Sequence, residues 1–288
     1  MDYIMHLSVL VGVYAILGLS LNLVVGYSGL LSLAHAAFYG VGAYGSAILM
    51  KDFGFSFLSA VVLSVLITMA VGVLIGLVLS KFDGDYYALA SLGFSVIAFG
   101  VFLNWRDLTN GAFGIFGIPK PEIFGYKFLA GEPYAFLVLL AVIFTFLICY
   151  FVVNSSFGRV LKAIREDEKA LQVFGYKTTL YKLAVFVISA GLAGFAGTLY
   201  GSYISFIDPG GFDDLVSVNL IVVVILGGLA SLNGSLLGAA FFVLLPELLR
   251  FVGMPDSITG QMRQMIYGLG LIALMMYRPQ GILGKFRL

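Results

Sequence analysis

The stretch that decides the fold is Phe55–Ser80, FSFLSAVVLSVLITMAVGVLIGLVLS, which contains no charged side chain. A helix needs about 20 apolar residues to cross the hydrocarbon core of a bilayer, and this run is long enough. Its residues do not alternate between polar and apolar, so the strand of an outer-membrane barrel is not favoured. The stretch therefore predicts a membrane-spanning helix.

The rest of the chain repeats this pattern. Of 288 residues, 61% are hydrophobic and 11% are charged, whereas soluble domains carry about 25% charged residues. The mean hydropathy is +1.05. The other apolar runs are Ile4–Val25, Gly29–Met50, Tyr86–Leu103, Pro133–Val153, Leu183–Phe206, Leu215–Leu232, Ser235–Val252 and the shorter Gln264–Tyr277. The sequence predicts an all-α polytopic integral membrane protein, one domain over residues 1–288, with eight or nine transmembrane or re-entrant helices.

The positions of the basic residues orient these helices. Six of the sixteen Lys and Arg residues lie between Asn154 and Lys182. The C-terminal end adds Arg278, Lys285 and Arg287, and no Lys or Arg precedes Lys51. Loops rich in Lys and Arg stay in the cytoplasm. We therefore expect segment 154–182 and the C-terminal end inside, and the N-terminus and connection 105–132 outside. If Gly29–Met50 or Tyr86–Leu103 is re-entrant rather than spanning, the N-terminus lies on the opposite side. The net charge of +1 offers no basic patch for a nucleic-acid partner, so lipid is the expected surrounding.

Segment 154–182 has the pattern of an amphipathic helix. Ser155 or Ser156 can cap its start, and Gly175 follows Phe174 as a C′ glycine. One apolar stripe is formed by Val160, Leu161, Ile164, Leu171 and Phe174. Such a helix either lies on the membrane surface or docks its apolar face into a cytoplasmic partner. The acidic run 166–168 disfavours the first alternative, because anionic lipid headgroups would repel it.

Polar residues within apolar spans are costly and often functional. Asn22, Ser32, His35 and Asn219 are the candidates for a translocation path, although His35 is also typical of a hydrogen-bonded packing residue. The Gly26–Gly29 stretch predicts an interrupted helix, a feature that commonly lines transport sites.

Two other features have structural explanations. Glu247 precedes Arg250 by three residues, which favours a local ion pair near the outer interface. Gly72 with Gly76, and Gly197 with Gly201, have the spacing of close helix contacts, either within the chain or between subunits.

No catalytic or metal-binding motif is present in the sequence. It contains no phosphate-binding Gly-x-x-x-x-Gly-Lys-Ser/Thr loop, no His-Glu-x-x-His and no Gly-x-Ser-x-Gly. We therefore expect no catalytic residue, no metal site and no cofactor. A protein of this kind is a transport component rather than an enzyme, and any ATP is bound by partner subunits.

Several blocks of sequence, in this order, are similar to those of the LivM-type permeases, membrane subunits of ATP-driven importers for branched-chain amino acids. Before the cytoplasmic segment they are Gly26–Phe38, Gly42–Tyr44 and Thr109–Gly111, and within it Ala163–Glu168 with Ala170 and Gly175. After it they are Lys182–Ala184, Ile188–Ala190, Ala193–Tyr200, Gly227–Leu229, Gly238–Ala239 and Arg278–Gly281. The likeness covers nearly the whole chain.

The resemblance implies a permease subunit that moves branched-chain amino acids across a prokaryotic cytoplasmic (inner) membrane. Its implied partners are a second homologous permease, two cytoplasmic ATP-binding subunits and an extracytoplasmic substrate-binding protein. The implied ATPase-coupling residues are Ala163, Ile164, Arg165, Glu166, Glu168, Ala170, Phe174 and Gly175. An importer of urea, short amides or other small solutes remains an alternative, as does an ion-gradient-driven transporter.

Overall fold

The computed structural model describes residues 2–123, 125–129 and 131–251, and beyond Phe251 only residues 262, 265–266, 268–270, 272, 276 and 281–284. Each of the first eight apolar runs contains one long helix. These helices are α1 (Asp2–Asn22), α2 (His35–Lys51), α3 (Phe57–Leu79), α4 (Asp85–Asn104), α6 (Glu132–Asn154), α8 (Thr178–Ile204), α9 (Asp214–Gly227) and α10 (Leu232–Phe251). The ninth run, Gln264–Tyr277, lies mostly outside the described residues.

The fold is an all-α polytopic membrane fold, as predicted. Five described helices are long and apolar enough to span a bilayer, namely α1, α3, α4, α6 and α8, and α9 and the first part of α10 are shorter apolar helices. The total of eight or nine spans stays a prediction. Helices α1 and α8 form the centre, with 83% and 67% of their apolar windows buried, whereas α3 and α6 bury only 28%. The outer helices therefore present apolar faces to lipid.

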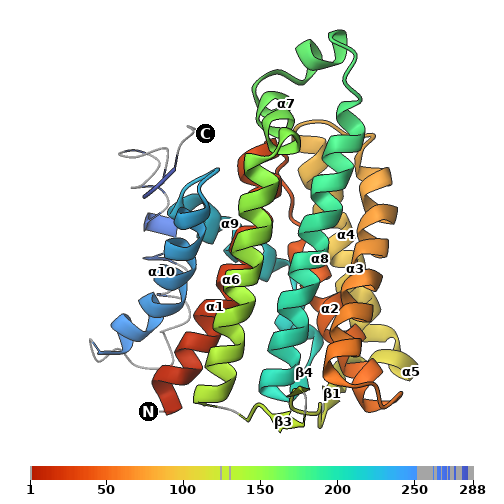
Figure 1. The fold of residues 1–288 in the computed structure, drawn as a ribbon, viewed down its shortest axis with the longest axis vertical. Helices are drawn as coiled ribbons and strands as arrows, with labels where there is room; N and C mark the ends of the chain where they lie inside the picture. The colour runs from red at the N-terminus through yellow and green to blue at the C-terminus, as the bar shows by residue number, and fades with distance from the viewer. Residues whose placement is uncertain are drawn as a thin grey trace.

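The two ends of the bundle differ in structure (Figure 1). One end carries α7 (Ser156–Val173). The other carries the N-terminus, the short helices α5 (Arg106–Thr109) and η2 (Gly111–Phe113), and two small sheets. Strand β1 (Ile115–Phe116) pairs antiparallel with β4 (Phe206–Ile207), and β2 (Glu122–Ile123) pairs with β3 (Tyr126–Lys127). The last short helix, η3 (Pro209–Phe212), follows β4.

Glycines decide how closely the central helices pack. A Cβ on Gly197 of α8 would lie 2.1 Å from the carbonyl oxygen of Tyr39 in α2, and one on Gly42 would lie 2.1 Å from that of Gly194. Gly72 and Gly76 of α3 likewise face α8. Because lipid tails are as apolar as the side chains, association of helices in a membrane depends on such close packing. The predicted glycine pairs serve packing within the chain, although Gly201 makes only ordinary contacts.

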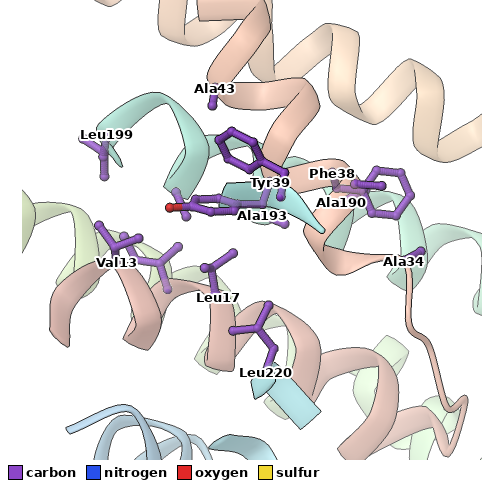
Figure 2. Packing of buried hydrophobic residues seen from close by; sticks show 14 of the residues in the cluster. Val13, Leu17, Ala34, Phe38, Tyr39, Ala43, Ala190, Ala193, Leu199 and Leu220 are labelled. Carbon is purple, nitrogen blue, oxygen red and sulfur yellow. The ribbon is translucent and has the colours of Figure 1, made fainter. Parts of the chain in front are cut away.

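The main core lies where α1, α2, α8 and α9 meet. Figure 2 shows Leu17 of α1, Tyr39 of α2, Ala193 of α8 and Leu220 of α9 around one buried centre. These four helices surround the residues that the sequence singles out, so the core fixes the candidate site described next.

Candidate functional site

The first feature of the site is a break between α1 and α2. The last turn of α1 widens into a π-helical turn, η1 (Leu23–Tyr27), and residues 29–34 are non-helical before His35 begins α2. Gly29 has φ +73°, a left-handed value that suits glycine. The interruption predicted at Gly26–Gly29 is confirmed, and it extends to Ala34.

Three backbone N–H groups of this break find hydrogen-bond acceptors inside the protein, as a membrane environment requires. The Leu30 N–H donates to the Val24 carbonyl at 3.2 Å, and the Leu33 N–H donates to Ser91 Oγ of α4 at 2.9 Å. Ser32 is fully buried, and its Oγ accepts the Ala34 N–H at 3.4 Å. The break is therefore an ordered, hydrogen-bonded segment.

Helix α2 begins inside the bundle, at His35. The Ala36 N–H donates to Ser217 Oγ near the start of α9 at 2.9 Å, so the N-terminal parts of two helices meet there. His35 Nε2 lies 2.9 Å from Ser189 Oγ of α8, whose hydroxyl donates to the Ser20 carbonyl at 2.5 Å. Since that hydroxyl proton is used, Nε2–H is the donor of this bond. His35 is thus tied to α8 through Ser189 and, through the hydroxyl of Ser189, to α1, while its Nδ1 has no hydrogen-bond partner among the described residues.

Asn22 joins α1 to the connection between α9 and α10. Its Nδ2 donates to the Ser231 carbonyl at 3.0 Å and to Ser235 Oγ at 2.7 Å. Its Oδ1 accepts the Ala230 N–H at 3.0 Å, and Ala230 has a φ of +54°. The side chain is fully buried. We call these contacts the Asn22 clamp.

The four predicted path residues therefore lie in different surroundings. Ser32 and His35 belong to the break, Asn22 to the clamp, and the half-buried Asn219 lies on α9 two residues after Ser217. Asn22, Ser32 and His35 are each at most 1% exposed. In this conformation Ser32 and His35 bond around the interruption and Asn22 bonds within the clamp, and their part in transport stays a prediction.

The serines that complete the site were missed from sequence. Ser91, Ser189 and Ser217 are buried, and their hydroxyl groups connect different helices around the break. A polar residue within a span was the available signal. This signal did not distinguish the connecting serines from others, because a buried serine such as Ser46, which donates to the Ala43 carbonyl of its own helix, looks the same in the sequence.

The second feature of the site is α7, which is divided in two. Ser155 Oγ accepts the Gly158 N–H at 3.3 Å and caps the helix, and Gly175 follows it with φ +85°, both as predicted. Asp167, however, has non-helical angles, φ −155° and ψ 96°, and its Oδ1 accepts the Ala170 N–H at 3.0 Å. The expectation of one continuous helix is wrong, because Asp167 ends the first part and caps the second.

The first part of α7 packs onto the end of α1. Leu161 and Ile164 are 0% and 5% exposed, in a cluster with Tyr27. The Arg165 guanidinium donates to the Gly26 carbonyl, and Lys162 Nζ lies 5.7 Å from the centre of the Tyr27 ring. Burial lowers the pKa of Arg165 below its usual value, and the nearby Glu166 opposes this shift. Arginine nevertheless stays charged in proteins, so its cation holds a carbonyl of the π-helical turn.

The junction of α7 with α8 is held by Glu168. Its carboxylate accepts from Thr178 Oγ1 at 2.8 Å and from Lys182 Nζ at 3.0 Å. Lys182 Nζ also lies 3.5 Å from Asp83 Oδ1 in the connection between α3 and α4. The side chain of Lys182 is 6% exposed and that of Glu168 26%, whereas that of Asp83 is 88% exposed, so the pair with Glu168 is partly shielded from water and the pair with Asp83 is not.

The predicted coupling residues therefore divide into two groups. Ile164, Arg165 and Glu168 contact the chain's own helices. Ala163 is half-buried, whereas Glu166, Ala170, Phe174 and Gly175 are exposed. Val173 and Phe174 are 86% and 80% exposed at the tip of the segment. Any role of these residues in coupling stays a prediction.

Two other predictions concern groups of charged residues. The proposed ion pair of Glu247 with Arg250 falls partly outside the described residues, because the side chain of Arg250 is not among them. Within the part of the chain that the structure describes, no group of His, Cys, Asp and Glu side chains is arranged to hold a metal ion.

Comparisons with known proteins match the chain along almost its whole length. The family model described as "Branched-chain amino acid transport system / permease component" matches residues 3–275. The chain is 36% identical to the high-affinity branched-chain amino acid transport system permease protein LivM of Salmonella typhimurium, over 96% of this chain and 68% of that protein.

Two further similarities are lower in identity. The chain is 28% identical to the permease protein BraD of Pseudomonas aeruginosa, over 94% of this chain and 92% of that protein. It is 27% identical to the permease protein LivH of Escherichia coli, over 94% and 91% respectively. No solved structure matches the chain.

Proposed function

The chain belongs to the family of permease components of branched-chain amino acid transport systems, and on this premise we propose that it imports branched-chain amino acids through the prokaryotic cytoplasmic (inner) membrane. It is a multi-pass membrane transport subunit. Its proposed partners are a second homologous permease, two cytoplasmic ATP-binding subunits and an extracytoplasmic substrate-binding protein. Hydrolysis of ATP takes place on those separate subunits.

The observation that supports this proposal most directly is the contact between α7 and the end of α1. Arg165 binds the Gly26 carbonyl, and its Cγ lies 3.0 Å from where a Cβ of Gly29 would be. Gly26 and Gly29 lie at the start of the break that leads to His35 and α2. A force applied to the exposed tip of α7 therefore reaches the interior of the bundle through the contacts of Arg165 with Gly26 and Gly29.

The mechanism follows from this connection. We assign the segment 154–182 to the cytoplasmic side, where closure of the ATP-binding subunits pushes on Val173 and Phe174. Arg165 passes the displacement to η1, together with Leu161 and Ile164, which lie in one cluster with Tyr27. Glu168 and Lys182 pass it to α8. Helices α1 and α8 both hold the start of α2 through Ser20 and Ser189. Access to the path then alternates as these helices shift against α2.

The decisive experiment is reconstitution. The chain is co-purified from its native membrane in mild detergent, its partners are identified by mass, and the assembly is placed in liposomes. We expect uptake of leucine, isoleucine or valine that depends on ATP and on the binding protein. Uptake of urea or short amides in their place would contradict the substrate, and uptake driven by an ion gradient without ATP would contradict the mechanism.

A further inference from the structure

A cavity at the end of the bundle that carries α7 has no part in the contacts described so far (Figure 1). It has a volume of about 330 Å³ and lies between α6, η1, α7 and the start of α10. Tyr27 of η1, Lys162 of α7 and Asn233 of α10 belong to its wall. We call it the lysine cavity.

We propose that the lysine cavity binds the phosphate group of an anionic phospholipid, whose charge lies against Lys162 and whose acyl chains run along α6 into the membrane. A lipid held there touches α6, α7 and the start of α10 at once. The site goes beyond the proposed function, because it does not depend on which solute the subunit transports.

The charge of the cavity favours an anion. Lys162 is half-buried, and its Nζ donates to the Val153 carbonyl at 3.5 Å and lies 5.7 Å from the centre of the Tyr27 ring. An ammonium group has three N–H donors, so donors remain for a ligand. Among the residues that the structure describes, no carboxylate lies within 4 Å of this Nζ, and none lines the cavity. A cation partly withdrawn from water and lacking a counter-ion attracts a phosphate.

Neutral polar groups surround this charge. Asn154, Ser231 and Asn233 contribute side-chain amides and a hydroxyl to the wall. Such groups can donate hydrogen bonds to phosphate oxygens, and those from the ammonium group are the stronger ones. Helix α10 begins beside the cavity at Leu232, and the amino end of a helix carries a partial positive charge that adds to that of Lys162.

The wall formed by α6 selects a lipid rather than a free phosphate ion. Phe146, Tyr150, Val153 and Asn154 follow one another at the spacing of one helix face. Asn154 is the last residue of α6, and Phe146 lies about 12 Å deeper at 1.5 Å per residue. The wall thus changes from polar at the helix end to apolar inside, in the order of a headgroup and its acyl chain. Tyrosine is typical of the membrane interface between them.

The position of the cavity also gives a lipid access. Only 28% of the apolar window of α6 is buried, so this helix borders the surrounding bilayer. Segment 154–182 is the stretch that we assign to the cytoplasmic side, and basic pockets between helices on that side of a membrane bind anionic headgroups. The lysine cavity has both properties.

Two other cavities lack this combination. A groove of about 560 Å³ between α3, α6 and α8 is lined by apolar side chains such as Leu66 and Ile188, and it offers no charge to a headgroup. A cavity of about 280 Å³ between α1, α2, α8 and α10 is lined by Tyr39, Tyr200 and Glu247 among others. Its described lining residues include no Lys or Arg.

The test is photolabelling of the complete, co-purified complex in liposomes. Phosphatidylglycerol with a diazirine in one acyl chain is compared with phosphatidylcholine that carries the same group, and the labelled peptides are identified by mass. We expect the α6 peptide with Phe146 and Tyr150 to be labelled about fivefold more by phosphatidylglycerol. This ratio corresponds to about 1 kcal/mol, the attraction of one basic residue for anionic lipid. The exposed Leu66 of α3 should show no preference.

Two substitutions locate the charge that causes the preference. Lys162→Gln should abolish it, whereas Lys169→Gln, at an exposed lysine of the same helix, should leave it unchanged. Asn233→Asp places a carboxylate at the cavity while suiting the start of α10, so the fold is retained and the preference should again be lost. This variant keeps the test informative if the Lys162→Gln complex fails to assemble.

The competing ligands separate a lipid from a free anion. Excess unlabelled phosphatidylglycerol should suppress the α6 label, and excess inorganic phosphate should leave it unchanged. Suppression by inorganic phosphate would overturn the lipid assignment in favour of a free anion. Equal labelling of α6 by the two lipids, or a preference that survives both Lys162→Gln and Asn233→Asp, would overturn the site itself.

Discussion

At the residue scale, Asn22 shows how one side chain can join segments more than 200 positions apart. Its amide donates to the Ser231 carbonyl and to Ser235 Oγ, and its oxygen accepts the Ala230 N–H. All of these groups are buried, where an unmade hydrogen bond costs more than the net gain of making one. The clamp therefore fixes the end of α1 against the start of α10.

Replacing this amide should destabilise the subunit. For Asn22→Ala we expect a loss of about 1–3 kcal/mol, the cost of leaving a buried polar group unpaired. A lower midpoint of thermal unfolding in detergent measures the effect. Asn104→Ala is the matched control, because Asn104 is exposed and, among the described residues, its side chain bonds to the Gly100 carbonyl of its own helix alone. Equal midpoints for the two variants would show that the clamp contributes nothing.

At the element scale, the close contact of α2 with α8 depends on positions that have no Cβ. Gly197 lies so near Tyr39 and Ala43 of α2 that an added methyl group would meet their backbone atoms at 2.1 and 2.7 Å. Backbone cannot move aside as the tip of a flexible side chain does. The two helices would have to separate, and the hydrogen bond between His35 of α2 and Ser189 of α8 would be strained with them.

The variant Gly197→Ala should therefore lower both stability and uptake. Overpacking of this kind costs about 1–3 kcal/mol, measured as the midpoint of thermal unfolding of the purified complex. Gly93→Ala in α4 is the control, since a Cβ there has no heavy atom within 4 Å. Alanine also favours a helix over glycine by about 1 kcal/mol, so the control should be neutral or slightly stabilised. A stable, fully active Gly197→Ala complex would contradict the close packing.

The connection between α7 and the break belongs to the same scale. For Arg165→Ala we expect an assembled complex whose ATP hydrolysis continues while leucine uptake per ATP falls about tenfold, a coupling loss of roughly 1.4 kcal/mol. Arg159→Ala is the comparison, because Arg159 is exposed and, within the part of the chain that the structure describes, its guanidinium bonds to Ser156 of the same helix alone. Both quantities are measured in the same liposomes. An unchanged ratio of uptake to hydrolysis would exclude Arg165 as a coupling element.

At the scale of the whole molecule, the two ends of the bundle differ in structure. The end with α7 presents Val173 and Phe174 to the surroundings, and residues 281–284 return to it, where the Ile282 N–H donates to the Leu226 carbonyl at 3.0 Å. The opposite end carries the two small sheets.

A substitution at the exposed tip should disrupt assembly without disturbing the fold. We expect Phe174→Asp to weaken the association with the ATP-binding subunits by about 2 kcal/mol or more, roughly thirtyfold, as for a central aromatic contact of an interface. The amount of ATP-binding subunit recovered with the tagged permease measures it. Phe113→Asp, an equally exposed phenylalanine at the opposite end, should change nothing there. Undiminished recovery with Phe174→Asp would place the ATPase contact elsewhere.

The sequence by itself determined the membrane class, the apolar helices, the interruption after Gly26 and both ends of the α7 segment. These features depend on local quantities, namely the length of apolar runs, the conformational preference of glycine and the hydrogen-bonding reach of a capping serine. Only the tertiary structure decided that Ile164, Arg165 and Glu168 turn inward, that Asn22 bonds across the chain, and that Glu247 borders a pocket with Tyr39 and Tyr200. Each of these contacts joins residues distant in sequence. Its energy depends on how helices pack in three dimensions, which no local pattern specifies.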